Sequence, residues 1–362
     1  MTKTTRWRSF IIRALTSAAL FGSPFSALAA PDYPSVPMSI VPPGTKLVVG
    51  DQNEQLQTLI KASGVSGKLV SKLQFANFLG GPEILEAFRA GVLDIAMVGS
   101  TPPIYAHAAG EPLPIVAALK GNAPAYRLAL RPGLKITTLQ ELKGKKIAWA
   151  EGTARQPFVL SALKKAALTT KDVTLVSLKV ADFPAAIRTG QVDVAPLNEP
   201  HLSRYLKGYA DEKASAIPDP EYAGMPTSTL YLYASKKALG DPAKAAAIRE
   251  LIAGWSEAVQ WTKGHPEAWV RAYYVKKQGL KEADGQSILK SDGEPGFPLL
   301  KDIVTDQQEL IDLIYQAGQL PRRLDAKEEF DFRYDVLMLD FVHLHDRDGK
   351  PEGFYHEMTT RA

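Results

Sequence analysis

The same pattern of apolar and polar positions occurs twice along the chain, with an offset of 99 residues. Residues 86–96 read EAFRAGVLDIA, and residues 185–195 read AAIRTGQVDVA. In each copy apolar residues recur at helical spacing, a glycine follows (Gly91 or Gly190), and a short apolar run begins after an aspartate. A helix that ends at a left-handed glycine and leads into a buried parallel strand has this pattern. We therefore predict two equivalent helix–turn–strand units.

A strand and a helix precede each copy, so both halves have the same order of elements. The apolar run 47–50 is followed by a helical pattern over 54–62, and the run 147–150 by one over 156–167. Strands that alternate with helices in this way form parallel sheets covered by helices on both faces. The chain is therefore predicted to be an α/β protein with two doubly wound lobes.

The region beyond the second copy has a different pattern. A strand is predicted over 226–233, and Asp241 and Pro242 then provide a helix N-cap and a first-turn proline. Apolar positions at helical spacing follow, and Thr305 with Gln308 has the form of a capping box before a further helix. We expect this helical C-terminal segment to pack back on the first lobe.

Such a return makes the chain cross between the lobes twice. The crossings are expected near residues 125–130 and 227–233. The first lobe would then comprise residues 38–126 and 227–335, and the second lobe residues 127–226. Two crossing segments between rigid lobes are typical of a hinge.

Length and composition agree with two packing units and exclude several classes of protein. The 362 residues are 45% hydrophobic and 23% charged, which is typical of a globular protein and excludes a disordered or collagen-like chain. A single core seldom exceeds about 300 residues, so two lobes are expected from length as well. Cysteine is absent, which excludes disulfides, thiolate metal sites, cysteine nucleophiles and a lipidated N-terminal cysteine.

Residues 1–29 have the three parts of a secretory signal peptide. Four basic residues accompany an apolar run at 14–21, and a small-x-small sequence provides a cleavage site near Ala29. Trp7 separates two of the arginines, so the twin-arginine export signal is missing and the general route is favoured. A membrane anchor is the alternative, but the apolar run is far shorter than the ~20 residues that span a bilayer. The basic residues are Lys3, Arg6, Arg8 and Arg13.

The net charge of +4 lies entirely in that segment. Without its four basic residues, 39 of the 43 Lys and Arg remain to balance 39 Asp and Glu. The mature protein is formally neutral, and no basic stripe indicates binding to nucleic acid or to an anionic membrane. We expect a monomeric periplasmic protein.

Signatures of catalysis and of phosphate binding are missing from the sequence. GxGxxG, GxxxxGK(S/T), GxSxG and HExxH do not occur. His343 and His345, near Asp346, Asp348 and His356, could bind a transition metal, but a solvated polar tail over residues 336–362 is the preferred interpretation. His107 lies among alanines and is interpreted as a surface or packing residue. We predict neither a metal nor a cofactor.

Small polar residues gather where predicted strands end and helices begin, at 80–81, 100–101 and 152–153. A helix N-terminus presents unpaired N–H groups and the positive end of the helix dipole, so each can hold an anion. These residues could also be ordinary N-caps of their own helices. Because all three places follow predicted parallel strands, where doubly wound sheets bind ligands, we predict an oxyanion site there.

Three segments resemble the periplasmic solute-binding proteins of nitrate, taurine and alkanesulfonate ABC importers. They are residues 82–113, 142–153 and 182–200, and the resemblance as a whole covers about residues 44–330. It implies a periplasmic binding protein of type II, in which two lobes close on a ligand.

Two departures from that family concern the ligand. Where sulfonate binders follow the shared aspartate with two tryptophans and Asp-Pro, this chain has alanine, asparagine and Glu199-Pro200. After Gly152, where the family has serines and a histidine, it has Thr153, alanine and Arg155. A smaller and more polar wall with an arginine indicates an anion that is bulkier or more polar than a short alkanesulfonate.

Arg155 has the most specific expected role. It falls on the first turn after Thr153, where a guanidinium can bind the oxygens of an anion that backbone donors already hold. It could instead be a solvated arginine that pairs with Glu151 or Asp182. The candidate ligand-binding residues are Gln52, Asn53, Phe78, Gly80, Gly81, Ser100, Thr101, Thr153, Arg155, Gln156, Asn198, Glu199 and Thr227.

The resemblance implies a substrate-binding component that delivers a sulfonate or related sulfur compound to an inner-membrane permease and its ATPase. One alternative is an enzyme on the same clamp fold, such as a pyrimidine-precursor synthase or a menaquinone-pathway enzyme. Such enzymes are generally cytosolic, and the synthase type uses cysteines and histidines that this chain lacks, so the signal peptide argues against them. A sensor that docks on a membrane receptor is the other alternative, and neighbouring genes would distinguish it from an importer.

Overall fold

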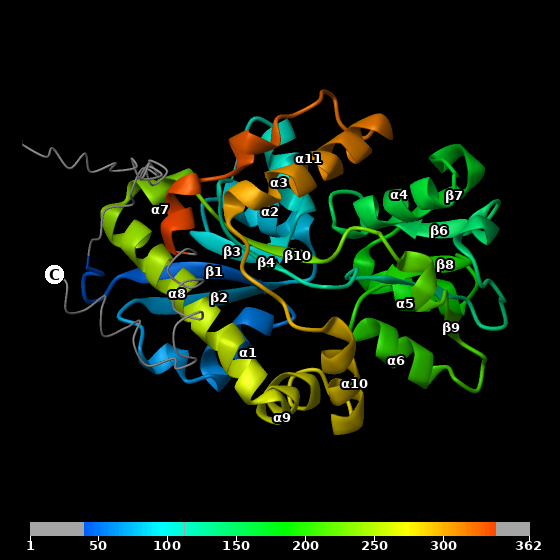
Figure 1. Ribbon diagram of the computed structural model, residues 1–362, viewed down its shortest axis with the longest axis horizontal. Helices are drawn as coiled ribbons and strands as arrows, with labels where there is room; N and C mark the ends of the chain where they lie inside the picture. The colour runs from blue at the N-terminus through cyan, green and yellow to red at the C-terminus, as the bar shows by residue number, and fades with distance from the viewer. Residues whose placement is uncertain (1–39, 112, 338–362) are drawn as a thin grey trace, which may run out of the picture. The chain divides into compact units, whose positions relative to one another are not determined.

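The computed structural model describes residues 40–111 and 113–337, which form two five-stranded sheets flanked by helices (Figure 1). The predicted signal peptide, residues 1–29, lies outside the described residues, as do residues 338–362 with the histidines of the polar tail. Within the described residues, no helix has the length and apolar character needed to cross a membrane.

The first sheet has the strand order β2-β1-β3-β10-β4. β1 pairs in parallel with β2 and β3, whereas β10 is antiparallel to β3 and β4. The strands are β1 (Lys46–Gln52), β2 (Lys72–Phe78), β3 (Ile95–Gly99), β4 (Ile115–Lys120) and β10 (Thr229–Ala234). The helices between them are α1 (Gln55–Ala62), α2 (Gly81–Arg89) and α3 (Thr101–Ala108).

The second sheet has the order β7-β6-β8-β5-β9 and repeats this plan. β6 pairs in parallel with β7 and β8, and β5 is antiparallel to β8. The strands are β5 (Arg127–Leu130), β6 (Lys146–Trp149), β7 (Thr174–Ser177), β8 (Val194–Leu197) and β9 (Ser215–Ala216). The helices are α4 (Arg155–Lys165), α5 (Phe183–Arg188) and α6 (His201–Gly208).

The aspartate of each sequence repeat has the same role in its sheet. Asp94 accepts a hydrogen bond from the Val48 N–H of β1 at 2.9 Å and pairs with Lys244. Asp193 accepts one from the Lys146 N–H of β6 at 3.0 Å and pairs with Arg131. Both carboxylates therefore fasten the start of the central strand to the turn before the third strand. The predicted two-lobe α/β fold is confirmed.

Two connecting segments join the sheets, residues 121–126 between β4 and β5 and residues 217–228 between β9 and β10. The first segment leads into β5, which is antiparallel to β8, and the second leads into β10, which is antiparallel to β3. The segments overlap the expected crossings, 125–130 and 227–233, at one end only, because residues 127–130 form β5 and residues 229–234 form β10. The exact lobe boundaries stay a prediction.

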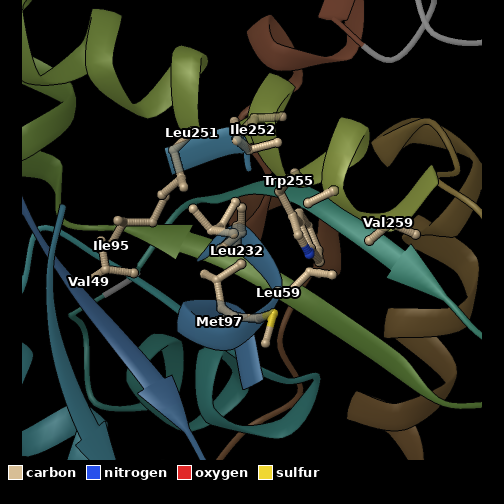
Figure 2. Close-up of a cluster of buried hydrophobic side chains, with 14 of the residues drawn as sticks. Val49, Leu59, Ile95, Met97, Leu232, Leu251, Ile252, Trp255 and Val259 are labelled. Atoms are coloured by element: carbon tan, nitrogen blue, oxygen red, sulfur yellow. The ribbon is translucent and has the colours of Figure 1, made fainter. Parts of the chain in front are cut away.

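Most of the C-terminal helical segment covers the first sheet, as expected. α8 packs on β1 and α1, and Leu251, Ile252 and Trp255 of α8 join Val49 and Ile95 in a buried cluster (Figure 2). The segment consists of α7 (Lys236–Gly240), α8 (Pro242–Gly264), α9 (Pro266–Trp269), a π-helix (Val270–Val275), α10 (Glu282–Asp292) and α11 (Leu300–Gln316).

α11 differs from the prediction in two ways. It begins at Leu300 and not after a capping box at Thr305, because the distant Asp335 accepts hydrogen bonds from the Leu300 and Lys301 N–H groups. It also does not pack on the first sheet alone. Leu300 belongs to a cluster with residues of the first sheet, whereas Ile311 belongs to a cluster with α4 of the second.

Candidate functional site

A cavity of about 1200 Å³ lies at the carboxyl ends of β1, β3 and β8. Residues of both sheets, of both connecting segments and of α11 form its wall. Small-molecule sites usually measure about 300–1,000 Å³ and lie at the carboxyl ends of strands in α/β sheets. This cavity therefore has the position of a ligand site and is large enough for a bulky organic molecule.

Seven of the thirteen candidate residues line the cavity. These are Gln52, Asn53, Ser100, Arg155, Asn198, Glu199 and Thr227. Phe78 lies with Asn53 on a smaller neighbouring cavity of about 200 Å³. The other five are not part of the wall of either cavity: Gly80, Gly81, Thr101, Thr153 and Gln156.

The three predicted helix starts do come together. A Cβ atom added to Gly81 at the start of α2 would lie 2.4 Å from Pro102 of α3 and 3.5 Å from the carbonyl oxygen of Gly152 before α4. A Cβ added to Gly99 would lie 2.9 Å from that of Ala154. Gly81 is required because α2 and α3 of the first sheet approach closely, and Gly99 is required because the end of β3 approaches the start of α4 in the second sheet.

However, several backbone N–H groups at these helix starts already donate hydrogen bonds within the protein, and prolines remove others. The Gly80 N–H donates to Glu83 Oε2 at 2.7 Å, and the Gly152 N–H donates to Gln156 Oε1 at 2.9 Å. Prolines, which have no N–H group, occupy the first turns of all three helices. The helix N-termini therefore offer few free donors, and an anion would depend more on side chains.

Arg155 is the side chain best placed for that role. Its Nε donates to the carbonyl oxygen of Pro196 at 3.2 Å and its Nη2 to Asn198 Oδ1 at 2.7 Å. The guanidinium carbon lies 4.9 Å from the centre of the Tyr126 ring, a cation–π contact. These contacts fix the plane of the guanidinium, and its other N–H groups have no partner among the described residues.

The charge of Arg155 has no carboxylate counter-ion within the described residues. Neither Glu151 nor Asp182 pairs with it, which was the alternative to a ligand-binding role. Burial lowers the pKa of the Arg155 guanidinium below its ordinary value, yet an arginine side chain keeps its proton in proteins. A partly buried, uncompensated positive charge on a cavity wall favours an anionic ligand.

His201 also lines the cavity. Burial, followed by the charges of Arg155 and Arg204, lowers its pKa to about 4. The ring is therefore neutral near pH 7 and adds no positive charge to that of Arg155.

The wall is more aromatic than the sequence indicated. The positions that hold tryptophans in the related family are indeed non-aromatic here, but rings from other segments replace them. Tyr126 and Phe158 lie with their ring centres 5.4 Å apart. The aromatic residues of the wall come from a connecting segment, α4, β10 and the π-helix. No single sequence motif therefore predicts them. The aromatic wall residues are Tyr126, Phe158, Tyr231, Tyr273 and Tyr274.

A buried polar network fixes the floor of the cavity at Ser100 and Tyr231. The Gln307 side chain of α11 donates to the carbonyl oxygen of Ser100 at 3.0 Å and accepts from the Tyr231 hydroxyl at 3.0 Å. Gln307 also donates to Glu329, which pairs with His107. His107 is thus buried and ion-paired rather than exposed.

Four acidic side chains also line the cavity, Glu199, Asp292, Asp306 and Glu309, and Asp306 pairs with Lys120. Burial raises the pKa of the half-buried Glu199. Asp292 keeps an exposed surface, and desolvation at the cavity wall together with the charge of Glu199 raises its pKa to about 6. Across the described residues, the cavity included, no group of three or more His, Asp or Glu side chains is arranged to hold a metal ion. Sequence reasoning did not find Asp292, since it ends a helix far from the repeated units.

Comparison with known proteins gives one family and consistent relatives. The model of the family described as NMT1/THI5 like matches residues 80–269. A protein of Escherichia coli (strain K12) named "Putative aliphatic sulfonates-binding protein" is 29% identical over 261 residues, 71% of this chain and 79% of the relative. A protein of Bacillus subtilis (strain 168) with the same name is 26% identical over 260 residues, 72% of this chain and 76% of the relative.

Solved structures have the same fold. The periplasmic aliphatic sulphonate binding protein SsuA from Escherichia coli is 25% identical, with a TM-score of 0.67 over 79% of this chain and 92% of that chain. The alkanesulfonate-binding protein SsuA from Xanthomonas axonopodis pv. citri, bound to MOPS, is 24% identical, with a TM-score of 0.69 over 80% and 99%. The family expected from the three sequence segments agrees with these relatives. The chain belongs to the NMT1/THI5-like family.

Proposed function

We propose that this protein is the periplasmic substrate-binding component of an ABC importer and that it captures an organic oxyanion of the sulfonate class. The observation that carries the proposal is the Arg155 guanidinium, which faces the large cavity without a carboxylate partner in the described part of the chain. The names of the relatives in Escherichia coli and Bacillus subtilis support the same class of ligand.

Arg155 can recognise a sulfonate through charge and geometry together. A guanidinium carries five N–H groups in one plane, and two of them already bind Pro196 and Asn198. The remaining N–H groups can donate to two oxygens of the same sulfonate, as a guanidinium does with a carboxylate or phosphate. Because Tyr126 and Asn198 hold the plane of the guanidinium, little side-chain entropy is lost on binding.

The proposed mechanism is closure of two lobes on the ligand. One lobe contains residues 38–126 and 227–335, and the other contains residues 127–226. Segments 121–126 and 217–228 would act as the hinge, since each lobe has its own sheet and few backbone angles need to change. After export and removal of residues 1–29, the monomeric protein would pass its ligand to a permease and its ATPase.

The proposal includes no catalysed reaction. Of the wall groups that could transfer a proton, His201, Glu199 and Asp292 have shifted pKa values, and desolvation is the largest cause of each shift. Recovery of a bound sulfonate unchanged after prolonged incubation with the protein would agree with a transport role.

A ligand screen followed by calorimetry tests the proposal. Thermal shift with alkanesulfonates, arylsulfonates, taurine, sulfate esters, nitrate and phosphonates should raise the melting temperature for the correct class, because a ligand that binds only the folded state stabilises it. For that ligand, Arg155→Ala should weaken binding by roughly 1.5–3 kcal/mol, the range for hydrogen bonds to a charged group. Arg155→Lys should recover only part of the affinity, since it restores the charge and not the planar fork.

Arg188 provides a matched control. It also lies over a tyrosine, 5.0 Å from the centre of the Tyr209 ring, but it pairs with Glu212 and does not line the cavity. Arg188→Ala should leave the affinity unchanged. Wild-type affinity in Arg155→Ala would move the anion site to the helix N-termini. A melting temperature that rises with neutral or cationic solutes but with no anion would refute the proposed function.

A further inference from the structure

Two helices of the cavity wall, α4 and α11, join the sheets through buried apolar contacts. Phe158 and Leu163 of α4 belong to the same buried cluster as Ile311 and Ile314 of α11 (Figure 1). Separating these helices would expose apolar surface, and its cost rises with the area exposed. We therefore expect α4 and α11 to stay together when the lobes move.

α6 and α10, which also lie side by side (Figure 1), meet through polar groups. Lys207 of α6 forms an ion pair with Asp284 of α10. The buried apolar residues of the two helices belong to separate clusters, with Ile288 of α10 in one that contains first-sheet residues and Leu202 of α6 in one that contains second-sheet residues. Partly exposed ion pairs contribute little stability. The lobes are therefore held more weakly between α6 and α10 than between α4 and α11.

Arg204 makes a second polar contact from the same face of α6, one turn before Lys207. Its Nη2 donates to the carbonyl oxygen of Gln278 and to Gln278 Oε1, the latter at 3.1 Å. Gln278 is fixed on its own side, because its Nε2 donates to the Asn53 carbonyl oxygen at 2.9 Å and its N–H to the Tyr273 carbonyl oxygen at 2.9 Å. Since the acceptor is already held in place, little side-chain freedom is lost when Arg204 binds it.

These contacts lie at the edge of the cavity. His201, at the start of α6, lines the cavity, and so do Asn53 and Tyr273, whose carbonyl groups hold Gln278. Movement of α6 away from α10 would therefore open the cavity on this side.

We propose that Arg204 and Lys207 are positioning residues, which form a polar latch with Gln278 and Asp284 that holds the cavity closed and slows the departure of a ligand. This inference rests on the lobe closure in the proposed function, but not on the class of ligand. The latch forms only when α6 meets α10, so it stabilises the closed arrangement and not the open one. Because the Lys207 side chain is 57% exposed, salt screens its ion pair, and the latch should weaken as the ionic strength rises.

Two spin labels can report the separation across the latch, since the chain has no other cysteine to react. Ala210→Cys, just after α6, and Gln286→Cys, on α10, place the labels at exposed positions. In the ligand-free protein, the mean distance between the labels should be longer in Lys207→Asp and in Asp284→Lys, because each variant sets like charges opposite each other. Exchanging both charges in one variant should restore the wild-type distance, which a general loss of structure would not allow.

Arg89→Ala is the matched control. It removes exposed ion pairs with Glu86 and Glu111, all on the first-sheet side, and should leave the distance between the labels unchanged. The latch would be overturned by a distance that is the same in every variant and at low and high salt. Failure of the double exchange to restore the wild-type distance would also overturn it.

Stopped-flow dissociation of 1-octanesulfonate, used as the probe, separates this inference from the proposed function. Lys207→Ala should release the probe about two- to fivefold faster than the wild type, the range of a partly exposed ion pair, and Arg204→Ala should do the same. High salt should accelerate release from the wild type more than from Lys207→Ala. Equal release rates in the wild type and both variants would overturn the latch and leave sulfonate binding in place. If the labels respond as expected and the protein binds no sulfonate, the latch stands and the proposed class of ligand is wrong.

Discussion

Arg155 and His107 illustrate how the surroundings of a side chain decide its role. Both were found in the sequence as single residues on predicted helices, and the sequence alone left each with two interpretations. In the structure, Arg155 meets a carbonyl, an amide and a ring but no carboxylate, so its charge is available to a ligand. The His107 ring lies within hydrogen-bond distance of two carboxylates, so its positive charge is compensated within the protein.

The pairing of His107 predicts a pH-dependent stability. Its Nδ1 lies 3.2 Å from Glu329 Oε1 and its Nε2 lies 3.0 Å from Glu328 Oε2. The hydrogen bond to Glu329, more than any other interaction, raises the pKa of His107 above the ordinary 6.5. The folded state then binds this proton more tightly than the unfolded state, so the stabilisation is complete below about pH 6.5 and is lost as the pH rises through the folded-state pKa.

Urea unfolding of the wild type and of His107→Gln at several pH values measures this effect. The free energy of unfolding of the wild type should exceed that of the variant most at acidic pH, and the difference should shrink toward alkaline pH. A difference that is the same at every pH would mean that the ring is not charged in the folded protein.

At the scale of elements, the sequence repeat predicted most of what the structure contains. The repeat identified α2 with β3 and α5 with β8, because both copies must bury the same apolar face and fasten the same strand through Asp94 or Asp193. Local signals were weaker for α11, whose N-terminal cap is the distant Asp335. No local pattern can indicate a cap that the chain supplies thirty-five residues later.

The turn glycines of the two copies should be equally sensitive to substitution. Gly91 and Gly190 have φ angles of 69° and 75°, which a residue with a Cβ adopts at a cost of about 1–2 kcal/mol. An added Cβ would meet no atom closer than 4.0 Å at either position, so the cost comes from the backbone alone. Thermal or urea unfolding of Gly91→Ala and Gly190→Ala should show a free energy of unfolding that is lower than that of the wild type by this cost.

A third glycine serves as the control for that prediction. Gly67 has open space around it and lacks a positive φ, so Gly67→Ala should not destabilise the protein. Asparagine adopts the left-handed region more readily than alanine. Gly91→Asn should therefore reduce the free energy of unfolding less than Gly91→Ala does. Equal stability of Gly91→Ala and the wild type would contradict the assigned turn.

At the scale of the whole molecule, the cavity brings together residues that are far apart in the sequence. Helix starts and strand ends indicated Ser100, Arg155 and Asn198, since these follow the repeated units. Tyr273 and Asp292 come from the C-terminal helices, and their place on the wall depends on how α10 packs on the π-helix. Pairwise spacing in the sequence contains no information about that packing, so this half of the site could not be predicted.

The approach of the two sheets at the cavity should depend on Gly99. Gly99 ends β3 of the first sheet, and a Cβ at this position would lie 2.9 Å from the Cβ of Ala154, which precedes α4 of the second sheet. Carbon atoms in contact prefer about 3.5–4.0 Å, so Gly99→Ala must hold these loops apart. Because Arg155 follows Ala154 directly, we expect the variant to bind its sulfonate about five- to tenfold more weakly, near the lower end of overpacking costs.

Calorimetry and small-angle scattering together test this prediction. In the wild-type protein, the ligand should reduce the radius of gyration through hinge closure. In Gly99→Ala the reduction should be smaller, while the melting temperature of the ligand-free protein stays the same, because the added methyl group lies between the sheets and not within either core. Gly296→Ala, where a Cβ meets no neighbour within 4 Å, should behave as the wild type. Full affinity and full compaction in Gly99→Ala would show that ligand binding does not require the close approach of β3 to the start of α4.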